Sequence, residues 1–181
     1  MKTLLIFLLS IAIFGCMAPP TDSLNATMTK PIQSGKLLYE DSEVGVVFKI
    51  TYNGVNFILK NKSSRPIRLI WDDVSFVKNG ETKKSMHKGV KYIDAKKTQV
   101  PTMIPPDAIL DELIFPSENA RYVSGQYGGW VSMPIFTRYE NGGMIGVLLP
   151  IEVGEAVRDY YFTFDVNLGR VKSRPSDSEG Y

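Results

Sequence analysis

The sequence predicts an all-β protein built as an antiparallel β-sandwich, and three observations support this fold class. Apolar and polar residues alternate over several short segments, turn sequences separate these segments, and the strand–helix alternation of a parallel sheet is missing from the pattern. Apolar residues make up 44% of the 181 residues, which is enough for one hydrophobic core. We expect about seven to nine strands in an immunoglobulin-like or transthyretin-like sandwich, with few short helical turns.

The segment 44–61 predicts a β-hairpin. Apolar residues occupy every second position from Val44 to Tyr52 and again from Val55 to Leu59. Between the two runs lies Asn53-Gly54, a dipeptide that strongly favours a tight turn because both residues tolerate positive φ. We therefore expect two adjacent antiparallel strands here.

The segment 67–88 predicts further strands with an irregularity between them. The alternation that starts at Ile67 changes phase at Asp72-Asp73, which indicates a bulge or a sharp bend. Asn79-Gly80 then predicts a second hairpin turn. The polar, lysine-containing run 82–88 that follows is typical of an exposed edge strand.

The remaining strands are predicted in the second half of the chain. Ile109 to Phe115 is the clearest strand in a proline-rich stretch, and the runs 145–153 and 160–168 alternate more regularly. Pro150 lies within the first of these two runs and has no N–H group. We therefore expect that strand to lie at a sheet edge or to contain a bulge.

The first residues of the chain have the plan of a secretory signal peptide. Lys2 precedes an apolar run from Leu4 to Phe14, which is shorter than the roughly 20 residues that a membrane-spanning helix needs. The run ends at the only cysteine, Cys16, which is preceded by Ile13 and Gly15. This arrangement resembles the lipobox of bacterial lipoprotein precursors; the other interpretation is a free cysteine after an ordinary secretory segment.

The resemblance implies that residues 1–15 are a signal peptide and that Cys16 is lipidated. In that family the cysteine sulfur receives a diacylglycerol group, the peptide before it is removed, and the new amino terminus is acylated. Several acyl chains hold a protein stably at a membrane, whereas one holds it marginally. Met17 replaces the aspartate of the family's inner-membrane retention signal, which implies a place in the bacterial cell envelope, at the outer membrane where the host has two.

The composition predicts four successive parts of the chain. After the signal peptide, residues 16–42 are rich in Pro, Thr, Ser and Asn and read as a lipid-anchored flexible tether, although the fold could instead begin at Leu37. Residues 43–169 form a single sandwich domain, and residues 170–181 are a polar tail.

The sequence offers little catalytic chemistry, and we predict a protein that is not an enzyme and has no metal or cofactor. Lipidation would occupy Cys16, and the only histidine, His87, lies between lysines that would oppose its protonation. The glycine-containing segment 125–129 lacks the Lys-Ser/Thr ending of a phosphate-binding loop. The formal net charge of +2 makes a nucleic-acid partner improbable.

The sequence contains two adjacent acidic pairs that could take part in catalysis, Asp72-Asp73 and Asp111-Glu112. Neighbouring residues of a strand point to opposite faces, so neither pair forms a carboxylate dyad by itself, and solvated turn or edge positions are favoured. The alternative is a carboxylate-dependent envelope hydrolase, for instance on glycans, in which two distant acids such as Asp73 and Asp111 meet in one cleft.

The best candidate for a binding site is the stretch 121–130. It contains Arg121, Tyr122, Tyr127 and Trp130 among glycines, and these residue types dominate the energetics of protein interfaces. We therefore predict a membrane-anchored lipoprotein whose β-sandwich binds another envelope protein in assembly, secretion, adhesion, inhibition or exclusion. Two alternatives stay open: the rings bind a glycan or a small ligand in an open groove, or they fill the end of the core.

Overall fold

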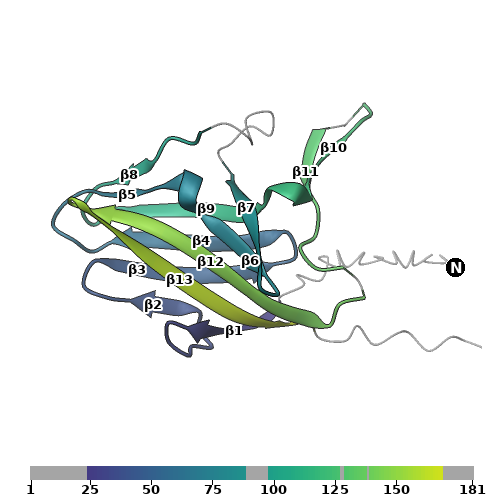
Figure 1. Cartoon of the computed structure of the whole chain (residues 1–181), viewed down its shortest axis with the longest axis horizontal. Helices are drawn as coiled ribbons and strands as arrows, with labels where there is room; N and C mark the ends of the chain where they lie inside the picture. Colours follow the sequence, from purple (N-terminus) through teal and green to yellow (C-terminus); the bar gives the residue numbers. More distant parts are fainter. Residues whose placement is uncertain (1–23, 89–97, 127–128, 138, 169–181) are drawn as a thin grey trace, which may run out of the picture.

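The computed structural model describes residues 24–88, 98–126, 129–137 and 139–168. Within them the chain is all-β and antiparallel, with two short 3-10 turns (Figure 1). The strands are β1 (Asn25–Lys30), β2 (Leu38–Glu40), β3 (Val44–Thr51), β4 (Gly54–Asn61), β5 (Ile67–Leu69), β6 (Ser75–Lys78), β7 (Glu81–His87), β8 (Thr102–Ile104), β9 (Ile109–Pro116), β10 (Ala120–Val123), β11 (Gly129–Ser132), β12 (Gly142–Val153) and β13 (Ala156–Asn167). The 3-10 turns are η1 (Trp71–Asp73) and η3 (Ser117–Asn119).

Eleven of these strands form one curled sheet, which confirms the predicted sandwich-like fold class with more strands than expected. The main path runs β1-β13-β12-β6-β7-β9-β4-β3-β2, and β5 joins β12 to β8. The curl brings the two ends of this path near each other, so that β12 and β13 face β3 and β4 across the interior (Figure 1). β10 and β11 form a separate two-stranded sheet.

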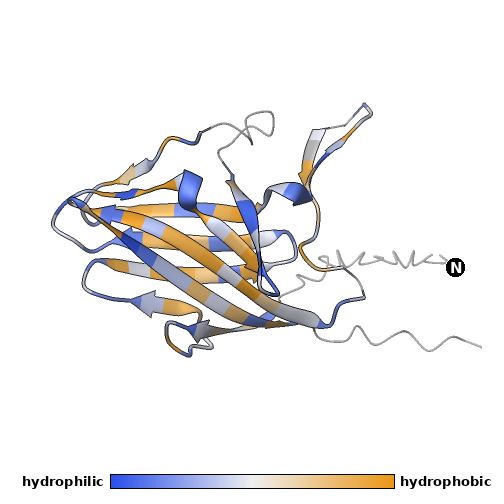
Figure 2. Cartoon of the chain, viewed as in Figure 1, coloured by the Kyte–Doolittle hydropathy of each residue, from blue (hydrophilic) through white to orange (hydrophobic). Residues whose placement is uncertain are grey.

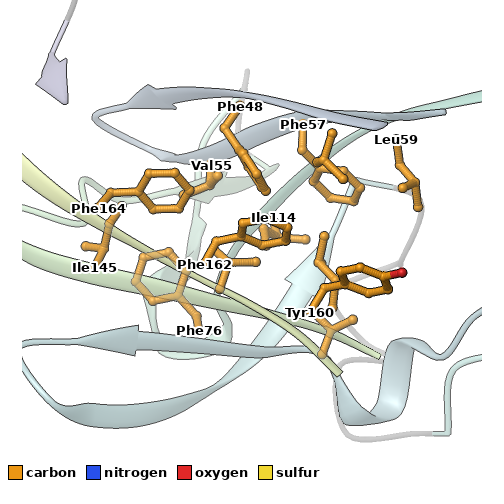
Figure 3. Close-up of a cluster of buried hydrophobic side chains, with 14 of the residues drawn as sticks. Phe48, Val55, Phe57, Leu59, Phe76, Ile114, Ile145, Tyr160, Phe162 and Phe164 are labelled. Carbon is orange, nitrogen blue, oxygen red and sulfur yellow. The ribbon is translucent and has the colours of Figure 1, made fainter. Parts of the chain in front are cut away.

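The core consists of the inward residues of both layers, and aromatic rings fill its centre (Figure 3). The ring of Phe48 lies 4.6 Å from that of Phe162 and 5.0 Å from that of Phe164, measured between centroids. Figure 2 shows the hydrophobic and hydrophilic residues alternating along the strands. The alternation in the sequence therefore reports which face of each strand is buried.

Both predicted hairpins are present. β3 pairs with β4 from Val44 opposite Asn61 to Thr51 opposite Gly54, with Tyr52 and Asn53 in the turn. The β6–β7 turn has positive φ at both Asn79 (49°) and Gly80 (87°), the conformation that an Asn-Gly hairpin turn requires. The predicted irregularity at Asp72-Asp73 is the turn η1 between β5 and β6.

Pro150 lies in a central strand, contrary to the prediction of an edge or a bulge. β12 pairs with β13 without a register shift along its whole length, and on its other side with β5 and then β6. Pro150 lies between these two partners, where its carbonyl oxygen accepts a hydrogen bond from the Ile70 N–H at 3.0 Å. The interruption of the neighbouring strand by η1 removes the need for an N–H donor at this position.

The polar strand β7 lies between β6 and β9 in the sheet path and is not an end strand. Residues 81–84 of β7 pair with β6, and residues 85–87 pair with β9, so the strand passes from one layer to the other. Each half has a strand partner on one side only, and the polar half 81–84 is the more exposed, as its sequence indicates. The edge strands of the main path are β1 and β2.

The first two strands lie inside the segment 16–42 that the composition predicts to be a tether. β1 pairs with β13, and Met28 of β1 is fully buried in the core. Residues 25–40 therefore belong to the folded domain, which begins well before residue 43. The predicted signal peptide, Cys16 and the predicted tail 170–181 lie outside the described residues.

Candidate functional site

The predicted binding stretch forms a two-stranded ribbon that projects from the sandwich. β10 and β11 pair with each other in the register Ala120–Ser132 to Val123–Gly129 and extend away from the main sheet (Figure 1). We call these two strands the ribbon. The sequence predicts an aromatic loop here; the structure shows that most of this loop is β-hairpin.

Hydrogen bonds fix the base of the ribbon to the sandwich. The Asn119 side-chain amide donates to the carbonyl oxygen of Pro134 at 2.8 Å and joins the two ends of the ribbon, and the Ser132 hydroxyl donates to the carbonyl oxygen of Asn53 in the β3–β4 turn at 3.0 Å. Directly after the ribbon, Ile135 and Phe136 are buried, and the Ile135 N–H donates to the Tyr52 carbonyl oxygen at 2.7 Å. The base therefore has a defined position next to the β3–β4 turn.

The ribbon exposes large side chains of the kind found at protein interfaces. Tyr122 is 60% exposed, and Val123 and Val131 are 45% and 40% exposed. Arg121 is exposed beside them. Burial of such aliphatic and aromatic surface favours association, and the loss of translational and side-chain freedom offsets part of this gain. The ribbon therefore presents exposed apolar, aromatic and charged side chains away from the core of the sandwich.

The four predicted site residues have different outcomes. Arg121 and Tyr122 are both exposed on β10, and Trp130 is the residue of β11 paired with Tyr122 in the backbone register. Tyr127 lies outside the described residues. Sequence reasoning missed Val123 and Val131; the alternation of residues 121–123 and 129–132 about the glycines could have revealed them.

A second cluster of polar residues surrounds His87. The imidazole stacks on the Trp71 ring with 3.8 Å between ring centroids, and its Nδ1 lies 3.7 Å from Oε1 of Glu112. The Trp71 indole N–H donates to the Thr102 hydroxyl at 2.7 Å. The structure thus brings to the lone histidine a carboxylate from β9, where the sequence shows only lysine neighbours.

Burial dominates the protonation of His87. Desolvation lowers the pKa of the imidazole more than the adjacent Glu112 carboxylate raises it, so the neutral form is favoured. The prediction that the surroundings of His87 oppose its protonation is therefore right, but the cause is burial of the imidazole and not the nearby lysines. The side chains of His87 and Glu112 are only 13% and 16% exposed, so this pair has little contact with solvent.

Several polar atoms of the described residues are buried without a hydrogen-bond partner. They are Ser85 Oγ on β7, Glu112 Oε2 on β9 and Gln99 Oε1. Ser85 is only 3% exposed, which keeps its hydroxyl away from a substrate. In the parts of the chain that the structure describes, no three His, Cys, Asp or Glu residues are grouped to hold a metal ion.

The acidic residues considered for a hydrolase do not meet. Asp111 lies on the outer face of β9 in a shallow groove with Val47 and Ile58, whereas Asp73 follows the buried Trp71 in η1. The ring of Trp71 packs against Phe57 on the inner face of the same layer. The two acids therefore lie on different elements, Asp111 on the outer face of β9 and Asp73 in the exposed part of η1.

A third polar group closes the seam between the two edges of the main sheet. The Asp41 carboxylate accepts hydrogen bonds from the Glu43 and Val44 N–H groups, both at 2.8 Å, and from the Tyr160 and Tyr39 hydroxyls at 3.0 and 3.3 Å. Burial and the Asp41 carboxylate raise the pKa of Tyr160 to about 12. A groove beside this group is lined by residues that include Tyr161 and Arg158.

Comparison of the chain with known protein families, curated proteins and solved structures found no match. Among the residues that the structure describes, no helix is long and apolar enough to cross a membrane.

Proposed function

We propose that this protein is a non-enzymatic lipoprotein of the bacterial cell envelope whose β-sandwich binds another envelope protein through the ribbon. One observation carries the proposal: a projecting hairpin, whose base is fixed to the sandwich, exposes Arg121, Val123 and Val131 on one face and Tyr122 on the other. A partner that buries these residues contributes to assembly, secretion, adhesion, inhibition or exclusion in the envelope.

The anchor supports a place in the envelope. Ile13, Gly15 and Cys16 resemble a lipobox, and a diacylglycerol thioether with a further acyl chain holds a protein stably in one leaflet. Met17 favours the outer membrane where the host has two. Mass spectrometry of the native amino terminus tests this part, since lipidation adds the mass of the acyl groups to Cys16.

The ribbon has two properties of a protein-binding element. Tyr and Arg bury large areas with little loss of side-chain entropy, and they are enriched among the residues that contribute most to binding. In addition, a two-stranded ribbon has two outer edges whose backbone groups can pair with an extended segment of a partner. We expect the partner to cover the exposed side of Tyr122.

The test is to use the mature chain with Cys16→Ser as bait in extracts of the envelope. The double variant Tyr122→Ala and Arg121→Ala should lose a partner that the unchanged ribbon retains. Val157, 54% exposed on β13 and far from the ribbon in sequence, provides the matched control Val157→Ala, which should retain it. Capture that is equal for all three chains would contradict binding through the ribbon.

A second candidate function is the binding of a glycan or a small ligand. The observation that favours it is the groove at the sheet seam, where Tyr39 and Tyr161 lie near the charged residues Arg158 and Asp159. Aromatic rings beside charged side chains can hold a sugar ring and its hydroxyl groups. This function predicts that Tyr161→Ala abolishes binding in a glycan array, while Tyr122→Ala has no effect.

A further inference from the structure

The position of β1 shortens the link between the domain and the proposed anchor. If the domain began at residue 43, 26 residues would separate it from Cys16; because β1 begins at Asn25, only the eight residues 17–24 do. Eight residues span about 30 Å at full extension, and a flexible chain of this length spans about 16 Å on average. The start of β1 is therefore held close to the surface that holds the anchor.

The pairings of β1 with β13 and of β13 with β12 show which other parts of the sandwich lie near the start of β1. Asn25 pairs with Asn167 at the end of β13, and Asn167 pairs with Gly142 at the start of β12. The Leu168 N–H donates to the Asn141 carbonyl oxygen at 3.0 Å. The loop 139–141 and the first three residues of β12, 142–144, which we together call the proximal loop, are therefore next to the start of β1, at the same end of the molecule as the β6–β7 turn (Figure 1).

The proximal loop exposes side chains that suit a lipid interface. Tyr139 is 87% exposed and Met144 is 52% exposed. Lys78 compensates the charge of Glu140, since the Lys78 Nζ lies 2.8 Å from the Glu140 Oε1. The loop therefore adds little net charge at this end. Tyrosine is enriched where membranes meet water, because its ring is apolar and its hydroxyl is polar.

The opposite end of the sandwich has a different surface. β12 and β13 are twelve residues long, about 40 Å, and they join at the far end in the turn beside Glu155. Arg65 lies against Gly154 in this turn, and Lys62 forms an ion pair of 2.6 Å with Glu40 in the neighbouring region. Exposed charged side chains at this end favour water over lipid.

We propose that the proximal loop rests on the lipid surface that holds the anchor, with Tyr139 in the interfacial layer. The proposal rests on the lipid anchor of the proposed function and adds an orientation: the start of β1 faces the membrane and the β12–β13 turn points away from it. Apolar contact by the loop adds to the acyl chains and limits the tilting that the short link would otherwise permit.

The test uses the natively lipidated protein, in which the thioether leaves no free thiol at Cys16. Tyr139→Cys then gives one labelling site for an environment-sensitive fluorophore, and Ser64→Cys, an exposed position beside Arg65 at the far end, gives the matched control. Both proteins are reconstituted into phosphatidylcholine vesicles with and without a nitroxide-labelled phospholipid. We expect a blue-shifted emission at residue 139 that the nitroxide quenches, with neither effect at residue 64.

Four other results would overturn the proposal. No quenching at residue 139 means that the loop does not contact lipid, and equal quenching at both positions means that the proposed orientation is wrong. Protection of the residue 139 label from aqueous iodide only after envelope proteins are added means that a protein covers the loop. In these three cases lipidation and binding by the ribbon stand. An unmodified Cys16 in the native chain removes the anchor and with it both proposals.

Discussion

Asp41 shows how a single side chain holds distant parts of this sheet together. Its carboxylate accepts hydrogen bonds from two neighbouring backbone N–H groups and from the hydroxyl of Tyr160, 119 residues later in the sequence. Burial raises the pKa of Asp41, but these hydrogen bonds lower it more, so the charged form is favoured. The bond to Tyr160 joins β2 to β13 where neither strand has a backbone partner on that side.

Tyr160→Phe should destabilise the protein by about 1 to 2 kcal/mol at pH 7, because it removes a hydrogen bond to a charged group. The wild type should also lose stability as the pH rises above 10 toward 12. The folded pKa of about 12 exceeds the usual value of 10, so the folded state keeps a proton that the unfolded state releases. Urea unfolding of the two proteins at pH 7 and pH 11 measures both effects. Tyr161→Phe is the control, and an equal loss there would contradict the role of Tyr160.

His87 makes a second prediction at the same scale, for acidic pH. Because burial lowers its folded pKa below the unfolded value, the folded state binds fewer protons, and its stability should fall as the pH decreases through about 6.5. His87 is the only histidine in the chain, which makes the effect easy to assign. Between pH 7 and pH 5 the free energy of unfolding of His87→Gln should change less than that of the wild type. If the free energy of unfolding changed with pH equally in the two proteins, a group other than His87 would be responsible for the loss of stability.

At the scale of elements, the local sequence predicts the two hairpins. It does not predict which other strands of the sheet pair with them. The alternation and turn residues of 44–61 predict β3 and β4 because a hairpin forms between neighbours in the chain. The pairing of β7 with both β6 and β9, and the place of Pro150 opposite the break between β5 and β6, depend on strands that are distant in sequence. The polarity of β7 therefore predicted its exposed half but not its place between β6 and β9, and Pro150 wrongly predicted an edge or a bulge.

Two turn glycines differ in what surrounds them, and this difference predicts different costs. A Cβ at Gly54 would lie 2.4 Å from the Ile114 carbonyl oxygen and 2.9 Å from Cδ1 of Leu113, whereas a Cβ at Gly80 would meet nothing within 4 Å. Gly54→Ala should therefore cost about 2 to 3 kcal/mol through displacement of β9 from β4. Gly80→Ala should cost about 1 kcal/mol through its positive φ alone. Thermal unfolding of both variants compares them, and a larger loss at Gly80 would refute the packing argument.

For the whole molecule, the first two strands cover the edges of the curled sheet that β13 and β3 would otherwise expose. β1 covers the edge of β13, and Tyr39 of β2 packs on Phe162 with 5.4 Å between ring centroids. The polar, proline-containing composition of residues 16–42 hides this role, because β1 is short and contributes one fully buried residue, Met28. A strand of this kind leaves only a weak pattern in the sequence.

A chain that begins at Ser42 should therefore fail to form a stable fold, whereas a chain that begins at Thr21 should unfold cooperatively. The shorter chain exposes the edge of β13 and the aromatic core beside Tyr39, and it loses Asp41 as well. Near-ultraviolet circular dichroism and urea unfolding distinguish the two. A cooperative transition of equal midpoint in both chains would show that β1 and β2 are dispensable.

The sequence by itself determined the all-β class, the main hairpins and the residue types that the ribbon offers to a partner. These features depend on periodicity and on turn residues, which act between neighbours in the chain. Only the tertiary structure decided that β1 pairs with the edge of β13, that Glu112 accompanies His87 and that Tyr122 is exposed on a projecting ribbon. Such relations join strands far apart in sequence, and they follow from how the curled sheet buries its inner face.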